Sequence, residues 1–376
     1  MDKKYVLSID AGTTSSRAII FNKNAEVIEI AQYEFNQFFP KEGWVEHDAI
    51  EIWNTQLKAI KDVINKSKIN PNEIDSIGIT NQRETTIIWD KRTGKPVYNA
   101  IVWQDRRTAS FCDELIEKNK TSLIQQKTGL VIDAYFSGTK IKWILDNNQD
   151  LREKANDNKL LFGTVDTWLI WNLTNGKSHI TDPSNASRTL LYNIKDDKWD
   201  KELLELFGVP ENILPKVVDS SSVSTNIDKE ILGVEIPISG IAGDQQAALF
   251  GQLCINEGDI KNTYGTGCFC MMNTGKNFVM SKNKMLSTIA WRINGKITYA
   301  LEGSVFVAGA LIQWLRDQLG IIKSSPEVEE LAKTVNDNGG LTFVPALSGL
   351  AAPYWDPYVH GTIFGITRGT ENGHIA

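Results

Sequence analysis

The sequence predicts an α/β protein built from two related units with a cleft between them. Short apolar runs typical of strands alternate with amphipathic patterns typical of helices. A strand, a small-residue turn and a second strand occur over residues 5–21 and again over residues 259–272. The 376 residues suffice for two or three domains. We expect an N-terminal domain of residues 1–250 and a C-terminal domain of residues 251–376.

The composition argues against two classes of partner. The formal net charge is -6 at pH 7, whereas nucleic acid and anionic membrane surfaces attract basic patches. No apolar run approaches the length of a membrane span, and the N-terminal residues do not resemble a signal peptide. We therefore expect a cytoplasmic protein with no nucleic-acid partner and no integral membrane segment.

The cysteines and histidines do not indicate a disulfide scaffold or a zinc site. The cysteine spacings show no pairing, and the four histidines are scattered without a partner four residues away. In a strand, Cys268 and Cys270 would be separated by a residue on the opposite face, and no histidine joins them. We interpret all the cysteines as small core residues in a reducing cytoplasm: Cys112, Cys254, Cys268 and Cys270.

The first strand, over residues 5–9, leads into a polar turn over residues 10–17 that returns into a strand at residues 18–21. This order makes a hairpin, whereas Rossmann and Walker loops run from a strand into a helix. Residues 27–35 continue as a third strand. The turn therefore belongs to a hairpin, and it would bind phosphate in a way different from that of a Rossmann or Walker loop.

The side chains of this hairpin suit a nucleotide phosphate. Gly12 lets backbone amides approach an anion, and Arg17 adds positive charge. Asp10, at the strand end, can hold magnesium through water. An ordinary polar turn is the alternative, but the turn at Gly265-Thr266-Gly267 repeats the pattern and favours phosphate. The hydroxyl donors are Thr13, Thr14 and Ser15.

The remaining elements follow from capping and periodicity. Asp48 is expected to cap a helix that ends near Asn70-Pro71, with Glu51 at the capping-box position. Residues 220–224 are expected to form a loop because they are rich in serine. The other predicted strands cover residues 74–80, 86–89, 259–263 and 268–272, and the other predicted helices cover residues 107–118, 137–146 and 303–319, the last carrying Gly309 and Gln313.

Arg83 and Glu84, between two strand-like runs, can together bind a small neutral polyol. The guanidinium donates hydrogen bonds in a fork and the carboxylate accepts them, so the doublet can hold adjacent hydroxyl groups. A surface ion pair that contributes little to stability is the alternative interpretation.

Asp244, in Gly243-Asp244-Gln245-Gln246, stands at the predicted start of a helix. A lone aspartate in this position is usually an N-cap. At a cleft between two domains, its carboxylate would instead reach a bound hydroxyl group and serve as a general base. Trp103 and Phe269 are most simply core aromatics, although flat aromatic walls also bind the C–H face of a polyol.

Taken together, these segments resemble the FGGY family of carbohydrate kinases. The similarity runs from Tyr5 to the last residue and is closest to the members that phosphorylate glycerol, because related sugar kinases usually lack Arg-Glu at positions 83 and 84. The segments that carry it are residues 12–17, 43–48, 81–86, 135–140, 243–246 and 264–268.

The resemblance implies two actin-like (ribonuclease-H-like) ATPase domains that close over ATP and glycerol. Asp244 would take the proton of a terminal hydroxyl as it attacks the γ-phosphate, and Asp10 would help to place Mg²⁺. The product would be sn-glycerol 3-phosphate, in the first step of glycerol catabolism. Glycerol would be bound by Arg83, Glu84, Tyr135, Asp244 and Gln245, with Trp103 and Phe269 against its carbon face, and the nucleotide by Thr13, Thr14, Ser15, Arg17, Thr266, Gly309 and Gln313.

The sequence ends inside the second family signature, which begins near Gly361. We therefore expect the C-terminal domain to be incomplete. Three alternatives stay open: a kinase for another polyol or ketose, an actin-like ATPase used for assembly, and an inactive fragment of a glycerol-phosphorylating enzyme. A homodimer and a homotetramer both stay open as well.

Overall fold

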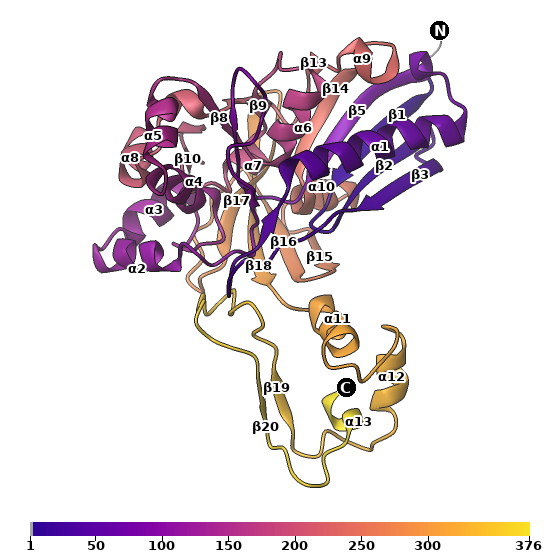
Figure 1. Ribbon diagram of the computed structural model, residues 1–376, viewed down its shortest axis with the longest axis vertical. Helices are drawn as coiled ribbons and strands as arrows, with labels where there is room; N and C mark the ends of the chain where they lie inside the picture. Colours follow the sequence, from indigo (N-terminus) through magenta and orange to yellow (C-terminus); the bar gives the residue numbers. More distant parts are fainter. Residues whose placement is uncertain (1–2) are drawn as a thin grey trace. The chain divides into compact units, whose positions relative to one another are not determined.

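The computed structural model describes residues 3–376, which form two compact units. Unit 1 contains the chain up to Asp259 together with Met272–Met280 and Leu286–Leu301, and unit 2 contains Ile260–Met271, Ser281–Met285 and Glu302–Ala376. Both units mix helices and strands (Figure 1). The domain division predicted at residue 250 remains a prediction.

The main sheet of unit 1 has six strands in the order β13-β14-β5-β1-β2-β3. Strand β1 pairs antiparallel with β2 but parallel with β5, and β5 pairs parallel with β14. Ala11 and Gly243 are both in register with Asn81, so β1, β5 and β14 end at the same edge. The bounds are β1 Tyr5–Ala11, β2 Ser15–Asn22, β3 Val27–Glu34, β5 Ile74–Asn81, β13 Ser221–Asn226 and β14 Pro237–Gly243.

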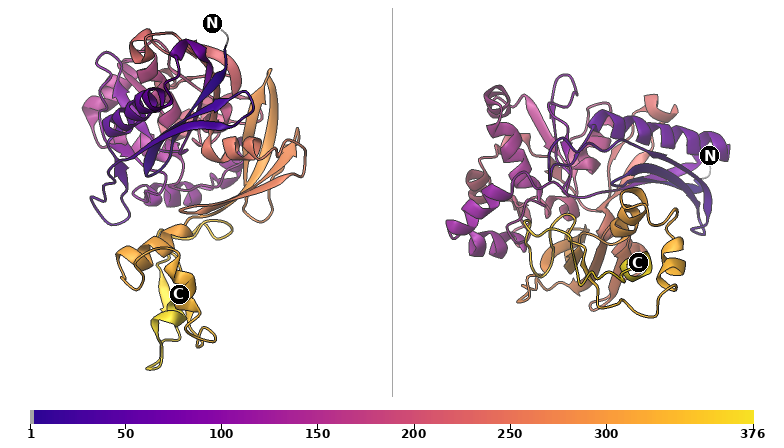
Figure 2. Two further views of the ribbon diagram at one scale, coloured as in Figure 1. Left: turned by 90° about the vertical axis from the view of Figure 1, so that its right-hand side faces the viewer. Right: turned by 60° about the horizontal axis from the view of Figure 1, so that its bottom comes forward.

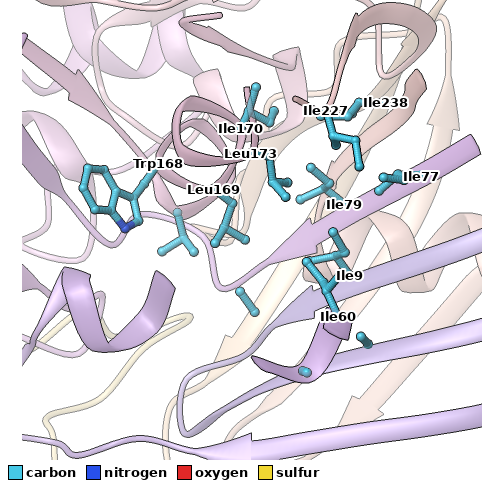
Figure 3. Close-up of a cluster of buried hydrophobic side chains, with 14 of the residues drawn as sticks. Ile9, Ile60, Ile77, Ile79, Trp168, Leu169, Ile170, Leu173, Ile227 and Ile238 are labelled. Atoms are coloured by element: carbon cyan, nitrogen blue, oxygen red, sulfur yellow. The ribbon is translucent and has the colours of Figure 1, made fainter. Parts of the chain in front are cut away.

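Two helices cover one face of this sheet and bury its core. Helix α1 (Ala49–Ser67) runs along the sheet (Figures 1 and 2), and Asp48 caps it by accepting a hydrogen bond from the amide of Ile50. Helix α6 (Val165–Leu173) supplies Trp168 and further apolar side chains. Figure 3 shows how these meet alternate residues of the strands. This packing holds the strand ends in place.

Unit 1 contains further short strands and helices outside the main sheet. Two-stranded sheets pair β4 with β7, β6 with β8, β9 with β12 and β10 with β11. The strands are β4 Glu46–His47, β6 Ile87–Asp90, β7 Ala100–Ile101, β8 Leu160–Gly163, β9 Ile180–Thr181, β10 Tyr192–Asn193, β11 Lys198–Trp199 and β12 Lys216–Val217, and the helices are α2 Ala109–Glu117, α3 Thr121–Thr128, α4 Ser137–Asp146, α5 Gln149–Asn156, α7 Pro183–Ala186, α8 Lys201–Phe207, α9 Lys229–Leu232 and α10 Asp244–Gly251.

A second sheet has the order β15-β16-β18-β17, and β16 and β18 contribute residues to both units. Unit 2 also contains the hairpin of β19 and β20. The bounds are β15 Ile260–Tyr264, β16 Cys268–Gly275, β17 Leu286–Ile293, β18 Lys296–Val305, β19 Thr342–Val344, β20 Thr362–Phe364, α11 Gly309–Asp317, α12 Glu327–Ala332 and α13 Asn372–Ile375.

Three local predictions were wrong. Residues 220–224 were expected to form a loop, but residues 221–224 belong to strand β13, because the backbone there pairs antiparallel with β14. The helix expected from Gly303 begins only at Gly309, since residues 303–305 end β18. Glu51, in the first turn of α1, accepts hydrogen bonds from Asn36 instead of completing a capping box with Asp48.

The interpretation of the cysteines was correct in part. Cys112 and Cys254 are buried, whereas Cys268 is half-buried and Cys270 is exposed. All four are free thiols. Cys270 fails as a core residue because alternate residues of β16 face opposite sides, and its own side is open to solvent. Within residues 3–376, no helix is long and apolar enough to cross a membrane.

Candidate active site

Arg83 and Glu84 are separated from the end of β5 by Gln82 alone and lie near the shared edge of the strand ends. Their side chains are only 2% and 1% exposed, respectively. The alternative of a surface ion pair is therefore wrong. Burial of two ionised groups is costly unless each finds charged or hydrogen-bonding partners, so their surroundings determine what the doublet can do.

The backbone of Glu84 is held in an unusual conformation. Its φ angle is +59°, in the left-handed region that costs a residue other than glycine about 1–2 kcal/mol. The Glu84 carbonyl oxygen accepts hydrogen bonds from the hydroxyl of Ser137 at 2.9 Å and from Nζ of Lys140 at 3.3 Å. Strain of this kind persists where the surroundings hold it, which is typical of functional sites.

Arg188, which sequence reasoning missed, holds the Glu84 carboxylate. Its Nε donates to Oε1 of Glu84 at 2.6 Å, and the Arg188 side chain is fully buried. It lies 104 residues further along the chain, after helix α7. A buried arginine cannot be distinguished from a surface arginine by composition, so the sequence carried no signal for Arg188.

Arg83 joins the doublet to three other candidate residues. Its guanidinium donates to the hydroxyl of Tyr135 at 3.3 Å and to Oε1 of Gln246 at 3.2 Å. Its Nε lies 3.3 Å from Oδ1 of Asp244. Two of the predicted substrate residues, Tyr135 and Asp244, therefore meet at one guanidinium. Gln246 joins them although it was not among the predicted site residues.

Asp244 is the first residue of α10, and the N-cap is Gly243. The expectation that Asp244 is an ordinary N-cap is therefore wrong. Its side chain is 38% exposed, and its carboxylate accepts hydrogen bonds from the amide nitrogen of Gln245 at 2.8 Å and from Nε2 of Gln245 at 3.0 Å. A carboxylate that is partly exposed beside a buried arginine remains accessible to a substrate hydroxyl.

A second carboxylate, Asp10, lies near Asp244 at the end of β1. Burial raises the pKa of the Asp10 carboxyl, the Arg17 guanidinium lowers it, and the negative charge of Asp244 raises it. Nη1 of Arg17 lies 3.8 Å from Oδ2 of Asp10. No cluster of three or more metal-ligating side chains occurs among the residues that the structure describes, but Mg²⁺ usually takes only one or two protein carboxylates.

The predicted phosphate hairpin lies between β1 and β2. The Gly12 amide donates to the carbonyl oxygen of Ser15 at 2.9 Å, which closes a tight turn. Ser15 accepts a hydrogen bond from Gln32, while Thr14 is exposed. The hydroxyl of Thr13 accepts a hydrogen bond from Nε1 of Trp103 at 3.0 Å. Thr13 thus connects the hairpin to Trp103, an aromatic residue that was predicted to contact the substrate.

Trp103 and Tyr135 form an aromatic wall beside the doublet. Their ring centroids are 5.8 Å apart with a T-shaped arrangement, and both residues are buried. Nζ of Lys140 donates to the carbonyl oxygen of Tyr135 at 2.6 Å as well as to that of Glu84. Burial lowers the pKa of Lys140 to about 7. Lys140 was also missed, because it belongs to a helical pattern without special spacing.

Two of the predicted nucleotide residues of unit 2, Thr266 and Gly309, lie at a second hairpin. The turn Gly265–Gly267 packs on the first turn of α11, where the Gly309 amide donates to the Gly265 carbonyl at 2.9 Å and the Ala310 amide donates to the Thr266 carbonyl at 3.1 Å. A Cβ atom on Gly309 would lie 2.6 Å from that Gly265 oxygen, so the contact requires glycine. Gln313 is exposed on α11, and Phe269 is buried in β16.

Comparison with known families covers nearly the whole chain. The model of the N-terminal domain of the FGGY family of carbohydrate kinases matches residues 5–251, and the model of its C-terminal domain matches residues 260–376. The chain belongs to the FGGY family of carbohydrate kinases. These matches confirm the resemblance to the FGGY family. They also confirm the fold class predicted for this FGGY kinase, an α/β protein with two actin-like domains.

Two relatives of this FGGY kinase are named as glycerol kinases. This chain is 62% identical over 372 residues to glycerol kinase 2 of Thermotoga maritima, and the match covers 99% of this chain and 75% of the relative. It is 60% identical over 373 residues to the glycerol kinase of Clostridium botulinum strain Langeland, with the same shares of 99% and 75%.

Solved structures agree with the fold of this FGGY kinase. The glycerol kinase of Plasmodium falciparum with ADP superposes with a TM-score of 0.85 at 38% identity, covering 100% of this chain and 75% of that chain. A xylulose kinase of Lactobacillus acidophilus superposes with a TM-score of 0.83 at 22% identity, covering 99% of this chain and 74% of that chain. At this identity, the match shows the fold alone.

Proposed function

We propose that this protein transfers the γ-phosphoryl group of ATP to glycerol and forms sn-glycerol 3-phosphate in the cytoplasm. The observation that carries the proposal is the buried Arg83-Glu84 doublet with Asp244 beside it, Nε of Arg83 lying 3.3 Å from Oδ1 of Asp244. The names of relatives at 60% and 62% identity support glycerol as the acceptor.

The doublet suits a small polyol. The Arg83 guanidinium donates hydrogen bonds and the Glu84 carboxylate accepts them, so two adjacent hydroxyl groups can be held in one orientation. Tyr135 supplies a further hydroxyl group, and Trp103 beside it offers an apolar surface to the carbon chain. Gln245 and Phe269 complete the proposed acceptor residues. A buried site that hydrogen-bonds each hydroxyl group rejects analogues that lack one.

Asp244 is proposed as the general base. Phosphoryl transfer depends mainly on positioning and charge stabilisation. The Asp244 carboxylate would accept the proton of the terminal hydroxyl while the oxygen attacks phosphorus. Arg83, at 3.3 Å from Oδ1, keeps this carboxylate oriented.

The residues proposed to contact the nucleotide lie on or near one hairpin in each unit. Thr13, Thr14, Ser15 and Arg17 offer hydroxyl groups and a positive charge, and Thr266, Gly309 and Gln313 are the corresponding residues of unit 2. The hard oxygen donors of Asp10 suit Mg²⁺, and a second carboxylate nearby adds to the attraction. When bound, Mg²⁺ neutralises phosphate charge in the transition state.

The decisive experiment is an acceptor panel. ADP formation from Mg-ATP is measured with glycerol, xylulose, erythritol or no acceptor, and the product is identified by ³¹P NMR. We expect glycerol-dependent ADP formation and a phosphomonoester of glycerol. A preference for xylulose would favour a ketose kinase, and acceptor-independent turnover would favour an actin-like ATPase used for assembly; either result would overturn the proposal.

Ligand-observed NMR with glycerol separates acceptor binding from turnover. The Arg83-Glu84 part of the site lies in unit 1. Glycerol binding that xylulose does not displace would support the acceptor assignment even if turnover is low. A folded chain that binds no glycerol would contradict it.

A further inference from the structure

Behind the proposed site lies a buried carboxylate that is not among the proposed substrate or nucleotide residues. Asp182, fully buried, precedes helix α7. Its Oδ1 accepts hydrogen bonds from the Ser184 hydroxyl at 2.8 Å and from the amide nitrogen and Nδ2 of Asn185, both at 3.0 Å. Its Oδ2 accepts hydrogen bonds from the Ser220 hydroxyl at 2.6 Å and the Ser184 amide at 3.1 Å. Four of these five donors belong to Ser184 and Asn185, which are therefore both fixed to one carboxylate.

The first connection from this carboxylate leads to β14. The Ser184 hydroxyl, which donates to Asp182, accepts a hydrogen bond from the Gly243 amide at 2.9 Å. Gly243 is the N-cap of α10 and directly precedes Asp244. The position of the Gly243 amide sets the direction in which α10 starts, and with it the position of the Asp244 carboxylate.

The second connection leads to β5. The side-chain amides of Asn185 and Asn81 exchange two hydrogen bonds, of 3.0 and 3.2 Å. Nδ2 of Asn81 also donates to the Gln82 carbonyl at 2.9 Å, and Asn81 is fully buried. The Arg83-Glu84 doublet follows immediately. The same carboxylate thus supports the segments before both the doublet and Asp244.

We infer that Asp182 and Ser184 are positioning residues that fix the proposed base, Asp244, relative to the Arg83-Glu84 doublet. This inference rests on the proposed function. Asp182 acts through Asn185 on the acceptor doublet and through Ser184 on the base. A misplacement of about 1 Å in a reacting group can reduce the rate about 100-fold, so a short buried network of this kind has a measurable effect on turnover.

The first test compares two serines of the same segment. Ser184→Ala removes the acceptor of the Gly243 amide, whereas Ser187→Ala removes a buried hydroxyl that bonds to the Ser184 carbonyl and to Thr288. We expect Ser184→Ala to lower kcat for glycerol phosphorylation by about 10- to 100-fold, as is typical for residues that orient catalytic groups. The KM for glycerol should change much less. Ser187→Ala should keep kcat within about threefold of the parent.

A double-mutant cycle tests whether Ser184 acts through the base. In an Asp244→Asn background, Ser184→Ala should have no further effect on kcat, because the group that it positions is absent. If the effects of the two substitutions on kcat multiply, Ser184 does not act through Asp244, and the inference is overturned. If Asp244→Asn alone keeps the parent kcat, the proposed role of Asp244 as base fails; the proposed function itself is tested separately by the acceptor panel. If Asp244→Asn loses kcat but Ser184→Ala does not, the inference alone fails.

A third measurement needs no turnover. Hydrogen exchange followed by NMR reports on the Gly243 amide, which should be protected in the parent and in Ser187→Ala but exchange faster in Ser184→Ala. Unchanged exchange at Gly243 would overturn the proposed connection. Asp182→Asn, which cannot accept all five hydrogen bonds, should speed exchange at Gly243 and weaken glycerol binding together; normal behaviour of both would also contradict the inference.

Discussion

Nε of Arg188 lies 2.6 Å from Oε1 of Glu84, and both side chains are almost completely buried. The carboxylate that we propose to accept hydrogen bonds from glycerol is therefore held by an arginine from a distant segment. Hydrogen bonds to charged groups contribute about 1.5–3 kcal/mol to stability.

Arg188→Met should lower the free energy of unfolding by about 1.5–3 kcal/mol and raise the KM for glycerol more than the KM for ATP. Chemical denaturation and steady-state kinetics measure the two effects. Glu84→Gln in the same chain is the partner variant for a double-mutant cycle. Additive effects of the two substitutions would contradict the direct interaction.

Asp244→Asn should lower kcat by about 10²- to 10⁴-fold, because the variant lacks a base for the attacking hydroxyl. The matched control is Asp75→Asn, which changes an exposed carboxylate of β5 and should leave kcat unchanged. A kcat of Asp244→Asn within about threefold of the parent would rule out its role as base.

Arg83→Ala should raise the KM for glycerol far more than the KM for ATP, since the guanidinium contacts Tyr135 and Asp244 on the acceptor side. Glycerol binding followed by NMR gives an independent measure. Equal effects on both substrates would mean that Arg83 acts on the fold rather than on the acceptor.

Gly243→Ala should disturb the acceptor site without removing a functional group. A Cβ atom at this position would lie 2.6 Å from Cδ of Arg83 and 3.0 Å from Oε1 of Gln246, so the Arg83 side chain must move. We expect a higher KM for glycerol. Gly251→Ala at the other end of α10, where a Cβ atom meets nothing within 4 Å, should leave the KM unchanged.

Lys140 predicts a pH dependence of stability. Its pKa is lowered from 10.5 to about 7 by burial, so the unfolded state binds more protons between these values. The free energy of unfolding therefore gains a contribution that rises with pH from about 7 to about 10.5 and is lost as the pH falls to 7. Urea unfolding at several pH values should show this rise in the parent but not in Lys140→Met. Lys118→Met, at an exposed position, should keep it.

The sequence was sufficient for the features that local chemistry determines. The short apolar run of β1 and the capping by Asp48 predicted their elements, and the position of the doublet between two strand-like runs placed it at a strand end. Strand β13 was missed because backbone pairing with β14 outweighed a composition typical of loops.

The candidate site was only partly predictable, because its supporting residues come from distant segments. Arg188 is 104 residues from Glu84, and Asn185 is 104 residues from Asn81. Lys140 stands in an ordinary helical pattern, and its contacts with two carbonyl oxygens arise only from packing. Such contacts depend on tertiary structure and leave no local signal.

At the shared edge of β1, β5 and β14, the positions of the site residues and the residues that surround them are determined by different parts of the chain. Evolution or engineering can therefore change the two independently. The backbone ladder sets where Asp10, Asn81 and Gly243 lie, whereas the long connection between β5 and β14 supplies what surrounds them. Acceptor preference can therefore be altered by exchanging segments of that connection other than the doublet and residues 182–185, while the ladder and the Asp182 network preserve the spacing between doublet and base. Chimaeras that keep the three strands, the doublet and residues 182–185 and replace the rest of the connection are the natural route to new acceptors.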